Sequence, residues 1–507
     1  MSNLGFQSVL GLLLSEPDVV CERAFREPDL PDAGRSLETG TPLSEFDVVA
    51  FSVSFEDDLL NLVAMLDAGG IPLRASERGD TDPLVVMGGV CAYLNPEPVA
   101  PFMDAVLVGE AEALVGPFVA NIRASHSRPR AERLRELAGV KGAYVPSLYE
   151  VERDEAGRIA GFRAEGDVPL PVRTATGSSR MAASVVLSDG AFLSDMLMLE
   201  VSRGCARGCR FCAAGSVLTP RVWYPATDVL GAMEGALDST TRVGLVTAAL
   251  LDHPEAGEIL EGALRMGVEV NISSLRADAV TPEVARLLSA CGVRTVTVAP
   301  ETGSEDLRRV IGKPVSDAAL LSAARAMAEG GIRALKLYFM IGVPGERDED
   351  VEAIPELARA IRSCFVEGRP DARVGVSVSA FVPKPRTAFQ WLPMADEARL
   401  RAGMSYLRKA FAGRPRMEFS GTGAREARRE GVLARGGREL SEAIRLAAIE
   451  RVPWKAALRR SGVDADAVLK RERVDGEVFP WEVVEVGPPR ETLQRSLTAA
   501  RRLLAGR

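Results

Sequence analysis

Three cysteines lie within eight positions of the stretch EVSRGCARGCRFCAAG, which covers residues 200–215. Cys205, Cys209 and Cys212 are spaced C-x3-C-x2-C, and the whole chain of 507 residues holds only seven cysteines. Thiolates at such short spacing bind zinc, hold an iron–sulfur cluster or form a redox-active pair. The glycines and arginines between them suit a packed core poorly, so scattered core cysteines are a weak explanation.

The surrounding sequence narrows these choices. A structural zinc site takes four ligands, and the nearby sequence offers no fourth cysteine or histidine. A C-x2-C redox pair would leave Cys205 without a role. A cubane iron–sulfur cluster can be held by three thiolates, which leaves its fourth iron open to a substrate or cofactor. We therefore favour an iron–sulfur cluster, with the zinc site, the redox pair and core cysteines as alternatives.

The composition is that of an ordinary globular protein. Hydrophobic residues make up 47%, charged residues 26%, and the net charge is −8. The chain therefore lacks the excess of basic residues that is typical of nucleic-acid-binding proteins, and there is no strong nucleic-acid signal. The N-terminus lacks the early basic region of a signal peptide, and no apolar run is long enough to span a bilayer. We expect a cytoplasmic protein without a membrane partner, in which thiols stay reduced. With only two histidines, a zinc enzyme that needs several imidazole ligands is nearly ruled out.

Strand-like and helix-like segments alternate in two parts of the chain. Residues 46–110 predict a parallel, doubly wound α/β sheet. Six strand-like segments between about residues 193 and 385 predict a partial βα barrel, and the three cysteines directly follow its first strand. The expected parts are an α/β domain at 1–142, a linker with a β-hairpin around DEAGR at 143–190, a βα barrel at 191–395, and a mostly helical region at 396–507.

The cysteine motif resembles that of the radical S-adenosylmethionine (SAM) superfamily. The resemblance rests on C-x3-C-x2-C with an aromatic residue, Phe211, before the third cysteine, in the loop after the first strand of a βα barrel. It implies a [4Fe–4S] cluster whose open iron binds the amino and carboxylate groups of SAM. It also implies reductive cleavage of SAM to methionine and a 5′-deoxyadenosyl radical, and an electron donor such as flavodoxin or ferredoxin.

Other segments resemble parts of the same SAM site. NISSLRAD places Ser274 and Arg276 at the end of a strand, where the guanidinium suits the SAM carboxylate. A surface ion pair is the alternative for Arg276. The second strand lacks the Gly-Gly-Glu of many members, and Thr247 stands at about that place, so we expect a backbone contact there. His253, beside Asp252, is a candidate catalytic group, although a loop-structuring role is favoured.

Two further segments complete the expected SAM site. APETGSEDLRRVIGK resembles the glutamate–glycine–serine segment of the superfamily, which makes Glu301 a candidate partner for the ribose hydroxyls. YFMIGVPGE resembles a glycine/proline turn whose backbone faces adenine. The predicted SAM-binding residues are Phe211, Thr247, Ser274, Arg276, Glu301, Ile341, Gly342 and Gly345.

The N-terminal α/β part resembles the Rossmann-like cobalamin-binding domain of the B12-associated radical SAM subgroup, through FSVSFEDDL, VVMGGVCAYLNPEP and DAVLVGEAEAL. Ser52 and Ser54 would lie near the lower face of cobalamin, while Gly88, Gly89 and Gly109 would allow close approach of its nucleotide tail. The family's D-x-H-x-x-G motif is absent, because residues 1–125 contain no histidine. Either cobalamin binds without histidine ligation, or the domain keeps the fold without the cofactor.

Three functions compete. The leading one is a methyltransferase-type radical enzyme that methylates an unactivated carbon, or makes a related radical modification, with cobalamin as methyl carrier. The second is a cobalamin-independent radical SAM enzyme that modifies RNA or a ribosomal component. A methylthiotransferase is disfavoured, because only Cys21 and Cys91 precede residue 200 and a second cluster of that type needs three cysteines. The third, a non-catalytic B12 or redox sensor, is disfavoured by the intact cluster motif and barrel.

Overall fold

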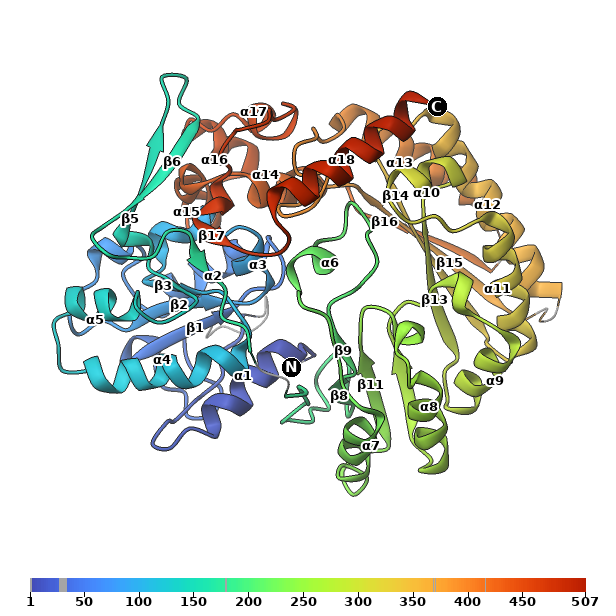
Figure 1. Ribbon diagram of the computed structural model, residues 1–507, viewed down its shortest axis with the longest axis horizontal. Helices are drawn as coiled ribbons and strands as arrows, with labels where there is room; N and C mark the ends of the chain where they lie inside the picture. The colour runs from blue at the N-terminus through green and yellow to red at the C-terminus, as the bar shows by residue number, and fades with distance from the viewer. Residues whose placement is uncertain (1, 27–33, 178–179, 368, 370, 415) are drawn as a thin grey trace. The chain divides into compact units, whose positions relative to one another are not determined.

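The structure is a computed structural model that describes residues 2–26, 34–177, 180–367, 369, 371–414 and 416–507 (Figure 1). The chain folds into two compact units that do not follow its linear order. The barrel unit comprises residues 1–4, 181–428 and 487–507, and the N-terminal unit comprises residues 5–180 and 429–486. The region expected as one helical part, 396–507, is therefore divided between the two units.

The N-terminal unit is built on a small sheet of four strands. β1 (Val48–Ser52), β2 (Leu84–Gly88) and β3 (Ala105–Leu107) are parallel, and β4 (Ala143–Tyr144) is antiparallel to β3. The α/β class is confirmed. The strands stand in the order β1-β2-β3-β4, so the described strands do not show the reversal of order that marks a ligand-binding switch point. Its helices are α1 (Leu4–Leu14, which begins in the barrel unit), α2 (Asp58–Ala68), α3 (Val90–Leu94), α4 (Ala111–Ser125) and α5 (Arg130–Leu137).

The predicted hairpin follows, formed by β5 (Tyr149–Arg153) and β6 (Ile159–Ala164). The Asp154 side chain accepts the backbone N–H groups of Ala156 and Arg158, both at 2.9 Å, which fixes the turn. β7 (Val172–Arg173) then pairs in parallel with β17 (Val484–Glu485), more than 300 residues later in the sequence. Residues 178–179 of the expected linker lie outside the described residues.

Residues 429–486 join the N-terminal unit through buried polar contacts. Arg438 donates to the buried carboxylate of Glu97 at 2.8 Å and to the hydroxyl of Tyr144 at 2.6 Å. Asn95 donates to two backbone carbonyls of the turn at residues 434–436, at 3.0 and 2.7 Å. A buried carboxylate left without such partners would be costly, so these contacts hold the segment in place. The helices here are α14 (Ala424–Arg435, which begins in the barrel unit), α15 (Ser441–Ala448), α16 (Trp454–Arg460) and α17 (Ala465–Leu469).

The barrel unit contains the six predicted strands, all parallel. β8 (Leu197–Glu200), β11 (Arg242–Val246) and β12 (Glu269–Ile272) form one sheet, and β13 (Thr295–Glu301), β14 (Ala334–Ile341) and β15 (Arg373–Ala380) form another. A parallel bridge between Leu275 and Val298 joins the two sheets. A seventh strand, β16 (Met417–Gly421), pairs with β15 inside the region expected to be helical. Its residues, MEFSG, alternate apolar and polar side chains, but five residues are too short a run to be told from their helical surroundings by pattern alone.

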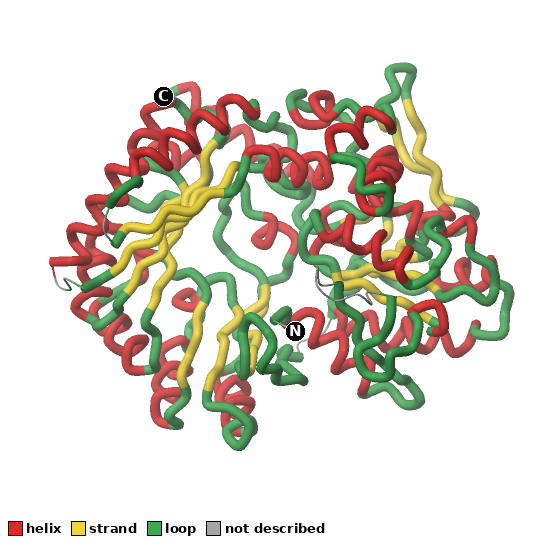
Figure 2. The backbone as a smooth tube through the Cα atoms, turned by 180° about the vertical axis from the view of Figure 1, so that it is seen from behind, coloured by secondary structure: helices red, strands yellow, loops and turns green. Residues whose placement is uncertain are grey.

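A layer of helices covers the outer side of this curved row of strands (Figure 2), whereas the short helix in the cysteine loop lies on the inner side (Figure 1). In β14, Leu335, Leu337 and Phe339 are buried, while the alternate residues Lys336 and Tyr338 are exposed. Parallel sheets are normally covered on both faces, so an open polar inner face is unusual. The helices are α6 (Ala213–Val217), α7 (Ala226–Glu234), α8 (Ala256–Arg265), α9 (Pro282–Ala290), α10 (Glu305–Val310), α11 (Asp317–Glu329), α12 (Asp348–Glu367), α13 (Glu397–Phe411) and α18 (Arg490–Ala505), with a short ribbon of β9 (Ser202–Arg203) and β10 (Val222–Trp223).

Among the described helices, none combines the length and the apolar character needed to cross a membrane.

Candidate active site

The three cysteines lie in the loop that leaves β8 and β9 and ends at α6. All three are free thiols that are neither fully buried nor fully exposed. Burial raises the pKa of the Cys209 thiol to about 11 and also raises the pKa of Cys212. Cys205 adds to both shifts, and Cys212 adds to that of Cys209. The three sulfurs are therefore close enough to influence one another and sit where a bare thiolate would be costly without a cation.

Arg210, between two of the cysteines, fixes the shape of this loop. Its guanidinium donates to the carbonyls of Arg309 and Val310, at 2.9 and 2.7 Å, and to that of Ser496 in α18 at 3.0 Å. Its backbone N–H donates to Ile311 at 2.8 Å. Carbonyls at a helix C-terminus lack partners within the helix, so Arg210 caps α10 while it ties down the loop. The arginine thus has a structural role that the sequence did not assign.

Gly312 provides the close contact between this loop and the turn after α10. Its φ of +77° and its position against the chain both require glycine, because a Cβ there would lie 2.6 Å from the carbonyl oxygen of Gly208. The cysteine loop is therefore packed directly on the segment that carries Glu301 and Lys313.

The Cys205 side of the loop is held by a different ion pair. The backbone N–H of Arg207 lies 3.4 Å from the Cys205 sulfur, and its guanidinium makes a two-point contact with Asp252. His253 is buried; its Nδ1 accepts the Glu255 N–H at 3.0 Å, so its Nε2 carries the hydrogen and donates to the Tyr224 carbonyl at 2.9 Å. Both ring nitrogens are used, which assigns His253 the loop-structuring role.

Within the described ranges, no group of three or more His, Cys, Asp or Glu side chains is placed to hold one metal ion.

Arg276 lies in the loop after β12 and brings an unsatisfied donor to the site. Its side chain is 16% exposed and pairs with Asp278, but its Nε is buried without a hydrogen-bond partner among the described residues. Its charge also helps to lower the pKa of Asp252, the partner of Arg207, although Arg207 is the larger cause. A buried donor without a partner costs about 1–3 kcal/mol, which a bound carboxylate would recover. Ser274 lies two residues earlier and is partly buried.

Glu301 ends β13 in an unusual conformation. Its φ is +69°, rare for a residue other than glycine, and the strand register shifts at this point. Oε1 of Glu301 lies 2.7 Å from Nζ of Lys313, and the two side chains are 13% and 15% exposed. Burial raises the pKa of Glu301, while Lys313 opposes that shift. The sequence prediction missed Lys313, although it is the last residue of the quoted APETGSEDLRRVIGK.

Thr247 has its polar groups engaged within the chain. Its buried hydroxyl lies 2.6 Å from that of Ser202, and its carbonyl accepts the Ser273 hydroxyl at 2.7 Å. Phe211 is partly buried in the cysteine loop. Neither residue presents a free hydrogen-bonding group of its side chain to a ligand.

The predicted adenine-facing turn follows β14, and its backbone conformation accounts for two of its glycines. Gly342 and Gly345 have φ of +78° and +79°, a region that favours glycine. The Gly342 N–H donates to Glu346 at 2.8 Å, and Ile341 is fully buried.

Of the residues predicted to contact cobalamin, some are explained by packing within the chain and others are left open. Gly89 has φ +96°, and a Cβ there would lie 2.5 Å from the Val53 carbonyl oxygen, while Gly109 packs directly on the backbone of Ala175. Gly88 alone has room, because a Cβ there would lie 3.7 Å from its nearest neighbour, and Ser52 beside it is exposed. Ser54 is partly buried. With no histidine in this part of the sequence, the donor set does not by itself identify a cobalamin site.

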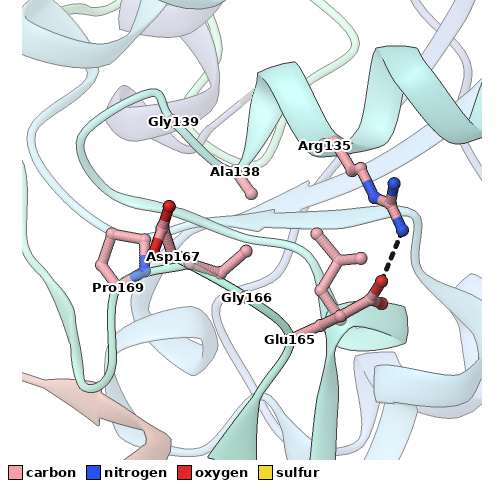
Figure 3. A pocket seen from close by; sticks show the side chains of 9 residues that line it. Arg135, Ala138, Gly139, Glu165, Gly166, Asp167 and Pro169 are labelled. Atoms are coloured by element: carbon pink, nitrogen blue, oxygen red, sulfur yellow. Dashed lines mark hydrogen bonds and ion pairs between the residues drawn. The ribbon is translucent and has the colours of Figure 1, made fainter.

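The N-terminal unit also contains a pocket of about 430 Å³ beside α5 (Figure 3). Arg135 and Glu165 form an ion pair across its rim, with side chains 65% and 55% exposed. Asp167 also lines this pocket, and none of the predicted site residues does.

Two family models match the chain. Residues 5–146 match the family described as radical SAM proteins, N-terminal, and residues 199–358 match the radical SAM superfamily. The second match contains all three cysteines, Arg276, Glu301 and Lys313. Neither description names cobalamin.

Individual relatives and solved structures share less than 30% sequence identity with this chain. An uncharacterized protein of Methanocaldococcus jannaschii is 28% identical over 70% of this chain and 70% of its own length, and one of Methanopyrus kandleri is 27% identical over 39% and 40%. The cobalamin-dependent S-adenosylmethionine radical enzyme OxsB aligns at a TM-score of 0.39 and 14% identity, over 62% of this chain and 44% of that chain. SuiB of Streptococcus suis, bound to SAM, aligns at 0.32 and 16% identity, over 45% and 49%.

The chain thus spans less than half of these solved structures, and TM-scores of this size support no inference about cofactors. The two family matches carry the assignment, because together they cover both α/β parts and the second contains the complete cysteine motif. This chain carries a domain of the radical SAM superfamily over residues 199–358 and the N-terminal domain of radical SAM proteins over residues 5–146, and enzymes of that superfamily use SAM and a [4Fe–4S] cluster.

Proposed function

We propose that this protein is a radical SAM enzyme that modifies an unactivated carbon of its substrate. With cluster and SAM bound, reductive cleavage of SAM would supply the 5′-deoxyadenosyl radical that abstracts the hydrogen. The observation that carries the proposal is the braced loop of three thiols, packed by Gly312 on the segment that holds Glu301 and Lys313.

The chain's own residues would divide the binding of the two cofactors. Cys205, Cys209 and Cys212 would hold the cluster, each as a thiolate. The buried Nε of Arg276 is a donor for the SAM carboxylate. Lys313 engages only Oε1 of Glu301, so Oε2 is left to accept a ribose hydroxyl.

The inner face of the barrel is the surface we assign to the substrate. Lys336 and Tyr338 are exposed there, and Ser377 on β15 stands in register with Tyr338. The side chains of these three residues have no hydrogen-bond partner within the described ranges. An open face with a cation and two hydroxyls favours a polar substrate over an apolar one.

The finer proposal is methyl transfer from cobalamin. It is supported by the resemblance of the N-terminal α/β part and by the exposed Ser52 and the open Gly88 at the ends of β1 and β2. Cobalamin would bind there without a histidine below the cobalt. A radical modification without cobalamin uses the same barrel residues and is the alternative.

The test uses the full chain, purified and reconstituted with iron and sulfide without oxygen. Reduced with dithionite, it should convert SAM to 5′-deoxyadenosine and methionine, slowly in the absence of substrate, as measured by mass spectrometry. Protein that holds about four irons per chain but yields no 5′-deoxyadenosine would contradict the proposal. One cobalt retained per chain after gel filtration with hydroxocobalamin would support the finer proposal, and none retained would favour the alternative.

A further inference from the structure

We infer that the inner face of the barrel binds a zwitterion of the amino-acid class, with its carboxylate held at Lys336 and its amine held at Glu418, across Gly375. The inference rests on the proposed function, which assigns this face to the substrate, and it names the class of that substrate. Glu418 lies on β16, the strand found inside the region expected to be helical.

Lys336 and Glu418 stand in one row across three neighbouring strands. In the parallel register of β14, β15 and β16, Lys336 pairs with Gly375, and Gly375 pairs with Glu418. Residues in register point to the same face of a sheet. Neighbouring strands are about 4.8 Å apart, so the two charged residues share the inner face with Cα atoms about 9.6 Å apart.

Gly375 keeps the space between the two charges open. A Cβ there would lie 3.8 Å from the Lys336 stem and 3.9 Å from the carbonyl oxygen of Leu335, which is ordinary contact, and the backbone is not in the left-handed region. Packing therefore does not demand glycine here, in contrast to Gly89 and Gly312. The effect of this glycine is that no side chain of β15 stands between the cation and the anion.

The chain leaves both charges without a partner. Lys336 and Glu418 are exposed, and among the residues that the structure describes neither side chain makes an ion pair or a hydrogen bond. Side chains stand roughly perpendicular to a sheet, so after a hydrogen bond of about 2.8 Å at each end, about 4 Å is left between the two ligand atoms. An amine and a carboxylate separated by a few carbons fit that distance.

Hydroxyl groups line the way from this charged row to the loops of the candidate active site. Tyr338, Ser377 and Ser420 form the next row in register, on the side of the carboxyl ends of the strands. Arg373, exposed at the start of β15, lies on the other side of the charged row and adds positive charge to the face. A ligand anchored by its two charges can therefore extend along the hydroxyls toward the end of β13, where Glu301 lies.

The experiment reverses one charge at a time and compares three probes that share a chain of four carbons: γ-aminobutyrate, succinate and putrescine. Binding to the full chain, without SAM, is measured by saturation-transfer difference NMR. The unchanged protein should bind γ-aminobutyrate in preference to the other two. Glu418→Lys, which places a cation on each side of Gly375, should lose γ-aminobutyrate and bind succinate. Lys336→Glu, which places two anions there, should lose it and bind putrescine.

Two control variants make the same reversals at exposed positions outside this face. Lys409→Glu in α13 and Glu356→Lys in α12 should keep the preference of the unchanged protein. If Lys336→Glu fails to fold, Lys336→Met takes its place and should lose γ-aminobutyrate, whereas Lys409→Met should keep it.

Equal signals from the three probes on the unchanged protein would overturn the inference, as would the same preference in both reversed variants. Formation of 5′-deoxyadenosine is measured separately. SAM cleavage together with no preference for γ-aminobutyrate would overturn this inference and leave the proposed function standing. Exchange of the preferred probe without SAM cleavage would support the zwitterion site and contradict the proposed function.

Discussion

The carboxyl ends of parallel strands form an edge in both units, and the two edges differ in what they offer a ligand. At the barrel edge, the loops after β8, β12 and β13 carry three thiols, the unsatisfied Nε of Arg276 and the Glu301–Lys313 pair. At the edge of the N-terminal sheet, the loops after β2 and β3 carry glycines that pack on the backbone of Val53 and Ala175.

The difference teaches that a ligand-binding position in a fold becomes a site only through its side chains. Strand ends are natural places for ligands in α/β proteins, and both units have them. In the barrel, the loops are braced by Arg210 and Gly312 and leave reactive groups unsatisfied. In the N-terminal sheet, the chain uses most of the space itself, so Ser52 and Gly88 are what it leaves open.

The largest effect is expected at the barrel edge. Replacing Cys209 by alanine removes one of three thiolate ligands and should abolish the cluster, because the loop offers no other thiol to take its place. Iron content and the visible absorption of the reconstituted protein measure this. Cys364→Ala, in the buried face of α12 away from the loop, is the control and should retain full iron. A Cys209→Ala protein that kept the cluster would remove the loop from the site.

Arg276 tests whether the unsatisfied donor binds SAM. Arg276→Ala should weaken SAM binding by about 1.5–3 kcal/mol, roughly a 10- to 150-fold rise in Kd, the range for a hydrogen bond to a charged group. Equilibrium binding to the reconstituted protein provides the measurement. Arg286→Ala removes an exposed arginine of α9 that pairs with Glu283 and should leave the affinity unchanged. Equal affinity in both variants would place Arg276 outside the site.

Substitutions of Gly89 and Gly88 test the edge of the N-terminal sheet. Gly89→Ala forces a side chain into a glycine-only backbone conformation and against Val53, and should destabilise the N-terminal unit by at least about 1–3 kcal/mol. Gly88→Ala meets no atom closer than 3.7 Å and should leave the denaturant midpoint nearly unchanged.

Cobalamin retention then separates the two roles. If methyl transfer from cobalamin is correct, Gly88→Ala should reduce the cobalt retained per chain without loss of stability. Unchanged retention in a stable Gly88→Ala protein would remove Gly88 from the predicted cobalamin site and leave its neighbour Gly89 as a purely structural glycine.

The last effect concerns pH and is expected at Glu346, in the turn after β14. Burial raises its pKa to about 7, against the opposing hydrogen bond from the Gly342 N–H. Because the folded pKa lies above the unfolded value, Glu346 contributes stability that is fully present below about pH 4.5 and is lost as the pH rises through about 7. Glu346→Gln should flatten this part of the profile, measured as thermal midpoints between about pH 5 and 8. Glu349→Gln, nearby in α12, should keep the slope of the unchanged protein.

The sequence by itself determined the features that depend on local spacing. The cysteine motif lies within eight residues of one loop, the hairpin turns on Asp154 and its immediate neighbours, and the six barrel strands are short runs of β-branched and apolar residues separated by helical periods. Each of these signals comes from residues that stay close along the chain, so each could be predicted before any tertiary contact was known.

Only the tertiary structure decided which distant segments complete the units and the site. Arg438 is held in the N-terminal unit by its hydrogen bond to Glu97, 341 residues earlier. Arg210 is held against α18 by its hydrogen bond to the carbonyl of Ser496, 286 residues later. The ammonium of Lys313 is positioned by Glu301, which lies before α10 in the chain, and Gly89 is a glycine because the backbone of Val53 packs against it. Such contacts between distant residues depend on how helices and strands pack against one another. This packing produces no periodic pattern in the sequence of either segment, so the contacts could not be predicted from it.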